Sequence, residues 1–167
     1  MTRLIFSILI ALSPATAQQQ GSLPFGTVTV PEGVSIVVVD DRGKQVTTTA
    51  AETAIQLPAG RYRMISWTLE RKDQDGNVWK LTGSAFGKKG VFKLIAGREV
   101  ELPVGEPAFS TLAMGKNGST YRLNHCLTGR LSESVEIRKN ENRPAAPELR
   151  ITNTDGSYQE TLSFGYS

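Results

Sequence analysis

The strongest constraint on the fold is the way polar and apolar residues alternate in short runs, which glycine, asparagine, aspartate and proline interrupt. No stretch has the spacing of a convincing amphipathic helix. Alternation with a period of two is typical of strands, and short strands separated by turn residues are typical of a sandwich or barrel. The sequence therefore predicts an all-β protein built from antiparallel hairpins.

The residues around Gly76 predict a hairpin and fix its register. A three-residue loop, Gln74 to Gly76, places Leu69 opposite Leu81, which pairs an apolar residue with an apolar residue. A two-residue loop would slip the strands by one residue and split the apolar set between the two faces. The predicted apolar face consists of Ile65, Trp67, Leu69, Trp79 and Leu81.

A second hairpin is predicted at Asn117-Gly118, where a two-residue turn pairs Met114 with Tyr121. In this register His125 shares a face with apolar neighbours, and we interpret it as a core-facing histidine, with a metal site as the alternative. Cys126 points to the opposite face, so the two residues are not placed to act as base and nucleophile. Because free cysteine is among the most buried residue types, we expect Cys126 to be a buried thiol.

The N-terminus has the three parts of a secretory signal peptide. Arg3 supplies positive charge, Leu4–Leu12 form an apolar run, and Ala15-Thr16-Ala17 offers the small residues that a signal peptidase needs. The apolar run is too short to span a bilayer, which takes about 20 residues. We therefore expect residues 1–17 to be removed, leaving a periplasmic or secreted chain with no membrane span.

The composition limits the partners and the sources of stability. The formal net charge is only +3, from 19 basic and 16 acidic side chains that are mixed along the chain, which argues against a nucleic-acid partner. A single cysteine in an exported chain excludes an intramolecular disulfide. Stability must then come from packed apolar surface.

The segment Glu70–Leu81 offers a choice between a cation site and a turn. Asp73, Asp75 and Asn77 alternate around Gly76, and their oxygens suit Ca²⁺. In an EF-hand the glycine follows the third ligand position and a glutamate comes six residues later, whereas here the glycine comes too early. We interpret the segment as a hairpin turn. A weak calcium site at Asp73, Asp75 and Asn77 is the alternative.

Few residues point to catalysis. His125 is the only histidine, which excludes a site with two histidine ligands, and there is no Gly-rich phosphate loop, G-x-S-x-G or C-x-x-C motif. A pair of carboxylates needs only the correct separation in space, so a carboxylate-based hydrolase is the alternative to a non-enzyme. The available acids are Glu70, Asp73, Asp75, Glu133 and Glu136. We expect no catalytic residue and no cofactor.

The aromatic residues Trp67, Trp79, Phe86 and Phe92 gather in the first half of the chain. Exposed aromatic rings serve as stacking platforms in sugar-binding sandwiches. Alternation places both tryptophans on the face of Leu69, however, so we interpret them as core residues.

The segment Val37–Met64 ends in Leu57-Pro58-Ala59-Gly60-Arg61-Tyr62 and resembles the transthyretin-like modules grouped as carboxypeptidase-regulatory-like. The resemblance covers about residues 27–104 and is interrupted by a long excursion, Arg71–Gly90. It implies an all-β Ig-like or transthyretin-like antiparallel sandwich and export, and it supplies no catalytic residues.

The second half resembles the end of exported bacterial proteins to which no activity is assigned. The resemblance rests on Gly105-Glu106-Pro107, Leu127-Thr128-Gly129 and Phe164-Gly165-Tyr166. The first of these divides the chain after the leader into residues 18–104 and 105–167. Each half is near the lower size limit for folding alone without disulfides, so we expect the halves to pack together.

These observations predict an exported, non-catalytic β-sandwich with a binding or structural role at the cell envelope. The expected partner is a protein or a cell-envelope polysaccharide. The sequence does not identify the residues that bind it.

Overall fold

The computed structural model describes residues 24–165, so the predicted signal peptide and its cleavage site lie outside the described residues. Within this range the chain forms strands and one 3₁₀ turn, η1 (Gly87–Gly90), which confirms the all-β prediction. The strands are β1 (Phe25–Thr29), β2 (Val34–Asp40), β3 (Gln45–Thr47), β4 (Ala54–Pro58), β5 (Gly60–Lys72), β6 (Val78–Ser84), β7 (Val91–Leu94), β8 (Glu99–Glu101), β9 (Phe109–Asn117), β10 (Thr120–Thr128), β11 (Ser134–Lys139), β12 (Glu148–Thr152) and β13 (Gln159–Ser163).

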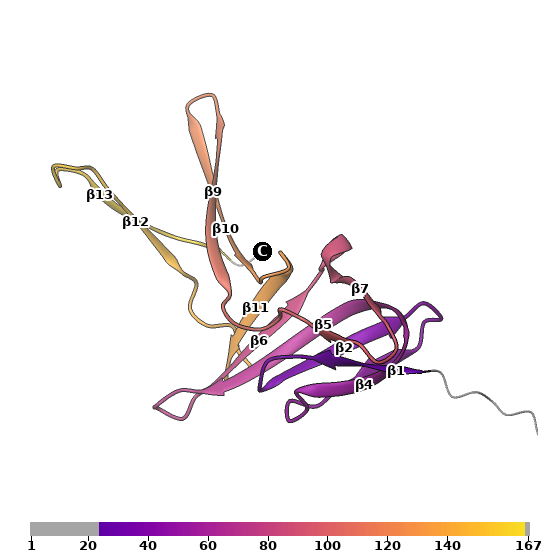
Figure 1. The fold of residues 1–167 in the computed structure, drawn as a ribbon. Helices are drawn as coiled ribbons and strands as arrows, with labels where there is room; N and C mark the ends of the chain where they lie inside the picture. The colour runs from indigo at the N-terminus through magenta and orange to yellow at the C-terminus, as the bar shows by residue number, and fades with distance from the viewer. Residues whose placement is uncertain (1–23, 166–167) are drawn as a thin grey trace, which may run out of the picture.

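The strands make three sheets (Figure 1). The largest is eight-stranded, with the order β3-β2-β5-β6-β11-β10-β9 and β7 paired with β5. A three-stranded sheet has the order β4-β1-β8, and β12 and β13 form a two-stranded sheet. The ladders are antiparallel except that β1 pairs with β8 in parallel, a departure from the predicted purely antiparallel arrangement.

The core lies between the three-stranded sheet and the part of the large sheet that contains β2 and β5. Fourteen of its fifteen buried apolar residues come from the first half of the chain, and Val135 is the exception. The others are Val28, Val30, Val34, Ile36, Val38, Leu57, Tyr62, Met64, Trp67, Leu69, Phe86, Leu94, Leu102 and Val104. Trp67 is 0 % exposed, which confirms the prediction that it belongs to the core.

The β5–β6 hairpin has the predicted register, with Leu69 opposite Leu81. The prediction for Ile65 is wrong, because its side chain is 39 % exposed. An irregularity in the β2–β5 ladder leaves Ile65 without a partner between Met64 and Ser66. This extra residue reverses the alternation, so Met64 is buried before it and Trp67 after it.

The Leu-Pro-x-Gly-x-Tyr segment forms a corner between β4 and β5. The Tyr62 hydroxyl donates a hydrogen bond to the Pro58 carbonyl oxygen at 2.8 Å. The Tyr62 ring also stacks on Phe92, with ring centroids 5.6 Å apart. These two contacts hold the corner between β4 and β5 in place.

The large sheet continues across the Gly105-Glu106-Pro107 joint, because β11 of the second half pairs with β6 of the first. Beyond β11, the β9–β10 hairpin projects away from the sandwich, and so does the β12–β13 hairpin (Figure 1). In β12–β13, Leu149 lies opposite Leu162. The second half therefore contributes an extension of the sheet and two projecting hairpins.

Two predictions for the β9–β10 hairpin are wrong. Its turn is Gly118-Ser119, so Met114 pairs with Leu123 and not with Tyr121. The two registers differ by two residues, and both pair apolar residues on the same face. Cys126 is exposed, since no element of residues 24–165 forms a layer over its side of the hairpin.

Candidate functional site

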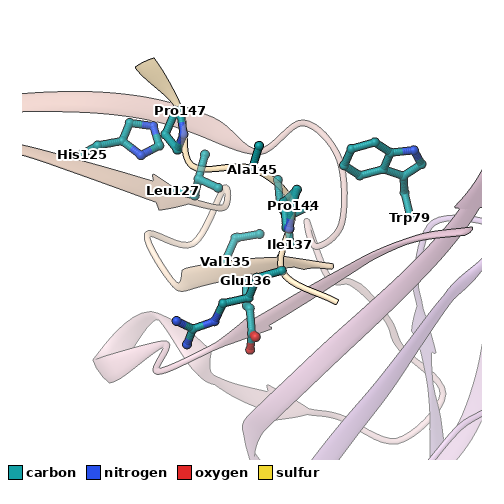
Figure 2. A pocket seen from close by; sticks show the side chains of 10 residues that line it. Trp79, His125, Leu127, Val135, Glu136, Ile137, Pro144, Ala145 and Pro147 are labelled. Atoms are coloured by element: carbon teal, nitrogen blue, oxygen red, sulfur yellow. The ribbon is translucent and has the colours of Figure 1, made fainter. Parts of the chain in front are cut away.

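An apolar cavity of about 430 Å³ lies where the second half of the chain meets β6. It lies on one face of β6, β11 and β10, beneath the segment that leads from β11 to β12 (Figure 2). Figure 2 shows Trp79 and His125 at opposite ends of the site, with Pro144 and Ala145 between them. The lining residues are Trp79, His125, Leu127, Val135, Glu136, Ile137, Arg143, Pro144, Ala145 and Pro147.

The floor of the cavity continues the face that carries the core. Ile137 lies opposite Leu81, and Leu81 lies opposite the buried Leu69. Because directly opposed residues point to the same side of a sheet, these three side chains share one face. In the first half this face is covered by the three-stranded sheet. In the second half its cover is the proline-containing segment 143–147.

Trp79 forms one end of the cavity and is fixed from two sides. Its indole Nε1–H donates a hydrogen bond to Asp73 Oδ2 at 2.9 Å. The Lys139 ammonium lies over its ring, 5.2 Å from the centroid, as expected for residues directly opposite on neighbouring strands. The prediction that Trp79 is a core residue is only partly right, since the side chain is half-buried in the wall of a cavity.

Asp73 begins the β5–β6 turn and is surrounded by N–H donors. Oδ1 accepts hydrogen bonds from the backbone N–H groups of Asp75 at 3.0 Å and Asn77 at 2.9 Å, and Oδ2 accepts from the Asn77 side-chain amide at 3.0 Å. The hydrogen bond from Trp79, followed by that from Asn77, lowers the pKa of Asp73 to about 2. The carboxylate is therefore ionised near neutral pH.

This geometry favours the turn interpretation over the calcium hypothesis. The three predicted ligands, Asp73, Asp75 and Asn77, are close together, but Asp73 uses both oxygens for N–H donors. The Asn77 side-chain oxygen accepts a hydrogen bond from the Asn140 amide at 3.0 Å. Within residues 24–165 there is also no group of three or more His, Cys, Asp or Glu side chains arranged to hold a metal ion. Calcium binding here stays a prediction.

The five carboxylates proposed for a hydrolase have separate local roles. Glu70 forms an ion pair with Lys80 at 3.5 Å, and Glu136 forms one with Arg138 at 2.9 Å. Asp73 and Asp75 belong to the turn. Of the five, Glu136 alone lines the cavity.

Glu133 is the remaining acid, and sequence reasoning missed its role. Its side chain is 0 % exposed, and Oε1 accepts a hydrogen bond from Trp67 Nε1 at 2.7 Å. Oε2 accepts one from the Leu131 backbone N–H at 2.9 Å. Glycines at 83 and 129 leave room for this pair, because a Cβ atom at Gly83 would overlap the Trp67 indole and one at Gly129 would overlap the carboxylate. Glu133 thus joins the second half to the centre of the core.

His125 forms the other end of the cavity. Its Nε2 is hydrogen-bonded to Ser110 Oγ at 2.8 Å, across the β9–β10 ladder. The ring packs at a tilt against Phe164, with centroids 5.5 Å apart. The prediction of a core-facing histidine is only partly right, because His125 is half-buried in a cavity wall and is not part of the main core.

Among residues 24–165, no helix is long and apolar enough to cross a membrane. Compared with known protein families, with curated proteins and with solved structures, the chain gives no match.

Proposed function

We propose that the chain is an exported, non-catalytic binding module of the cell envelope, and that the cavity between Trp79 and His125 is its binding site. The observation that carries the proposal is an apolar site of about 430 Å³ on the same sheet face as the core. Concave, largely apolar sites with a few polar groups are the usual form of ligand sites in proteins.

The lining favours an apolar segment of a protein partner. Leu127, Val135 and Ile137 form an apolar floor, and Arg143 from the covering segment adds a charged residue to the lining. A polysaccharide is the second candidate because Trp79 offers an aromatic ring. Lys139 lies over that ring, which leaves less of it for stacking against a sugar.

The rival functions have less support. A hydrolase of the paired-carboxylate type needs two acids about 5–9.5 Å apart across a cleft, whereas Glu136 is the only one of the proposed acids in the cavity. A calcium-binding protein needs oxygens that Asp73 and Asn77 already use within the turn.

We also propose that residues 27–104 form a transthyretin-like sandwich. The hydrogen bond from Tyr62 to Pro58, at the corner between β4 and β5, supports this assignment. So does the packing of the β4-β1-β8 sheet against β2 and β5 around one shared core.

Site-specific photocrosslinking in the native cell envelope tests the binding site. A photoreactive phenylalanine analogue placed at Leu127 lies in the cavity wall, and one at the adjacent Thr128 points to the opposite face of β10. We expect a protein adduct from position 127 that position 128 does not give. A polysaccharide adduct from position 127 alone would select the second candidate. Equal adducts from both positions, or none from position 127, would contradict the proposed site.

A further inference from the structure

The eight-stranded sheet ends in a long strand whose outer edge has no partner within the described chain. This strand, β9, pairs with β10 on one side only. All nine of its residues are exposed, and Met114 is 68 % exposed. In an antiparallel ladder alternate residues direct their N–H and C=O groups away from the neighbouring strand, so β9 presents a row of hydrogen-bonding groups to its surroundings.

Other edges of the large sheet and of the three-stranded sheet carry features that discourage pairing. At the opposite end of the same sheet, β3 has only three residues. In the small sheet, β8 is also three residues long and has glutamate at both ends, while β4 ends in Pro58. Short edges, charges and proline are the usual protections against edge-to-edge pairing. From Phe109 to Gly115, β9 has neither a charge nor a proline.

The sequence of β9 is complementary to itself. When two copies of the strand run antiparallel about a two-fold axis at Ala113, Leu112 of one copy lies opposite Met114 of the other, and the reverse pair is identical. Both side chains are exposed in the single chain, and both lie on the face that β10 continues with Leu123 and His125. Lys116 then lies opposite Ser110, so no like charges oppose each other.

We propose that two copies of this chain pair through β9, so that their large sheets join into one sheet across a two-fold axis. This register overlaps all nine residues of the strand and satisfies outward backbone groups on both copies. It also places Leu112 and Met114 beside their counterparts, which reduces the apolar surface that the hairpin exposes. The partner is a second copy of the chain because the two central pairs set Leu112 against Met114 and no like charges oppose each other in this register.

Charge variants at the two central positions test both the dimer and its register. We expect sedimentation equilibrium of the purified exported chain to show a dimer. L112K/M114K places a lysine opposite a lysine in both central pairs, and the dimer should weaken by about tenfold or more, whereas L112K/M114E places a lysine opposite a glutamate and should restore association. The melting temperature of each variant shows whether the sandwich is intact.

The proposal is overturned if the native chain sediments as a monomer, or if two intact charge variants associate equally. A distance between spin labels is a second test, and it needs no variant because Cys126 is exposed and is the only cysteine. Cys126 lies on β10, opposite Thr111 of β9. In the proposed dimer the two β10 strands are three strand spacings apart, and the two Cys126 residues are offset by four residues along the strands. A nitroxide on each Cys126 should therefore give an interspin distance centred at about 20 Å. A dimer that lacks this distance would contradict pairing through β9.

Discussion

Residues 25–104 and residues 109–165 show the same alternation of polar and apolar residues, but their side chains are buried to very different extents. In β2, Val34, Ile36 and Val38 are buried beneath the three-stranded sheet, whereas no residue of β9 is buried. Both strands nevertheless belong to one sheet. The difference teaches that alternation specifies a strand and its two faces, and that burial depends on whether a second layer covers one of those faces.

The largest expected loss of stability is at the centre of the core in residues 25–104. Trp67→Ala removes a fully buried indole and also leaves Glu133 without one of its donors. We expect a loss of about 3–5 kcal/mol in the free energy of unfolding, out of a total of about 5–15 kcal/mol for a domain. Urea unfolding measures it, with Thr68→Ala on the opposite face as the control. Equal stability of the two variants would contradict the core assignment.

A smaller loss of stability is expected when Glu133, which links the two halves, is replaced. Glu133→Ala leaves the N–H groups of Trp67 and Leu131 without their acceptor, which costs about 1–3 kcal/mol for an unsatisfied buried donor. Glu133→Gln keeps one side-chain oxygen and should be the less damaging change. Thermal melts of the three proteins measure this order, and an unchanged melting temperature for Glu133→Ala would show that the link adds no stability.

The Asp73 turn should make stability depend on acidity. Its folded pKa of about 2 is below its ordinary value of 3.8, so its contribution is fully present above about pH 4 and is lost as the pH falls toward 2. Asp73→Asn should lose this part of the pH dependence. Melting temperatures between pH 2 and pH 6 test it, and parallel curves for the two proteins would rule out the contribution.

In the uncovered half we expect truncation to have little effect. Leu162→Ala on β13 changes a side chain that is 38 % exposed, so stability should stay within about 0.5 kcal/mol of the native value. Urea unfolding measures it beside Leu69→Ala in the core. A loss at Leu162 comparable to that at Leu69 would mean that the second half has a packed core of its own.

The smallest expected effect is that of calcium. If the Asp73 side chain serves only the turn, added Ca²⁺ should leave the melting temperature unchanged at neutral pH. Magnesium at equal ionic strength is the control for general salt effects. A rise that is specific to calcium and absent in Asp73→Ala would establish the alternative instead.

The sequence predicted the β5–β6 register because a slip of one residue would have moved Leu69 away from Leu81 and exposed one of them. The prediction for β9–β10 took Asn117-Gly118 as the turn, and apolar matching could not correct it because a slip of two residues keeps every side chain on its face. There the turn decides, and Gly118 takes a positive φ of 59° as the first of its two loop residues. Matching apolar residues across a hairpin therefore excludes only those registers that would move side chains to the other face of the sheet.

The errors at Cys126 and Ile65 have different causes. The tendency of cysteine to be buried did not hold at Cys126, which is exposed on the face of β10 opposite to the one that lines the cavity. Ile65 is the extra residue at an irregularity between two strands, and no residue type marks such a position in advance. The cavity could not be predicted because it depends on the path of segment 143–147, which crosses over strands that are distant from it in sequence.

The contact between Trp67 and Glu133 also has a consequence for how the chain folds. The two residues are 66 positions apart, and the neighbouring pairing of β6 with β11 joins comparably distant segments. The closing of such long loops slows folding, because their entropy must be lost before the contacts form. The core therefore lacks the Glu133 acceptor, and the edge of β6 stays open to mispairing, until residues 133–139 have packed against the first half.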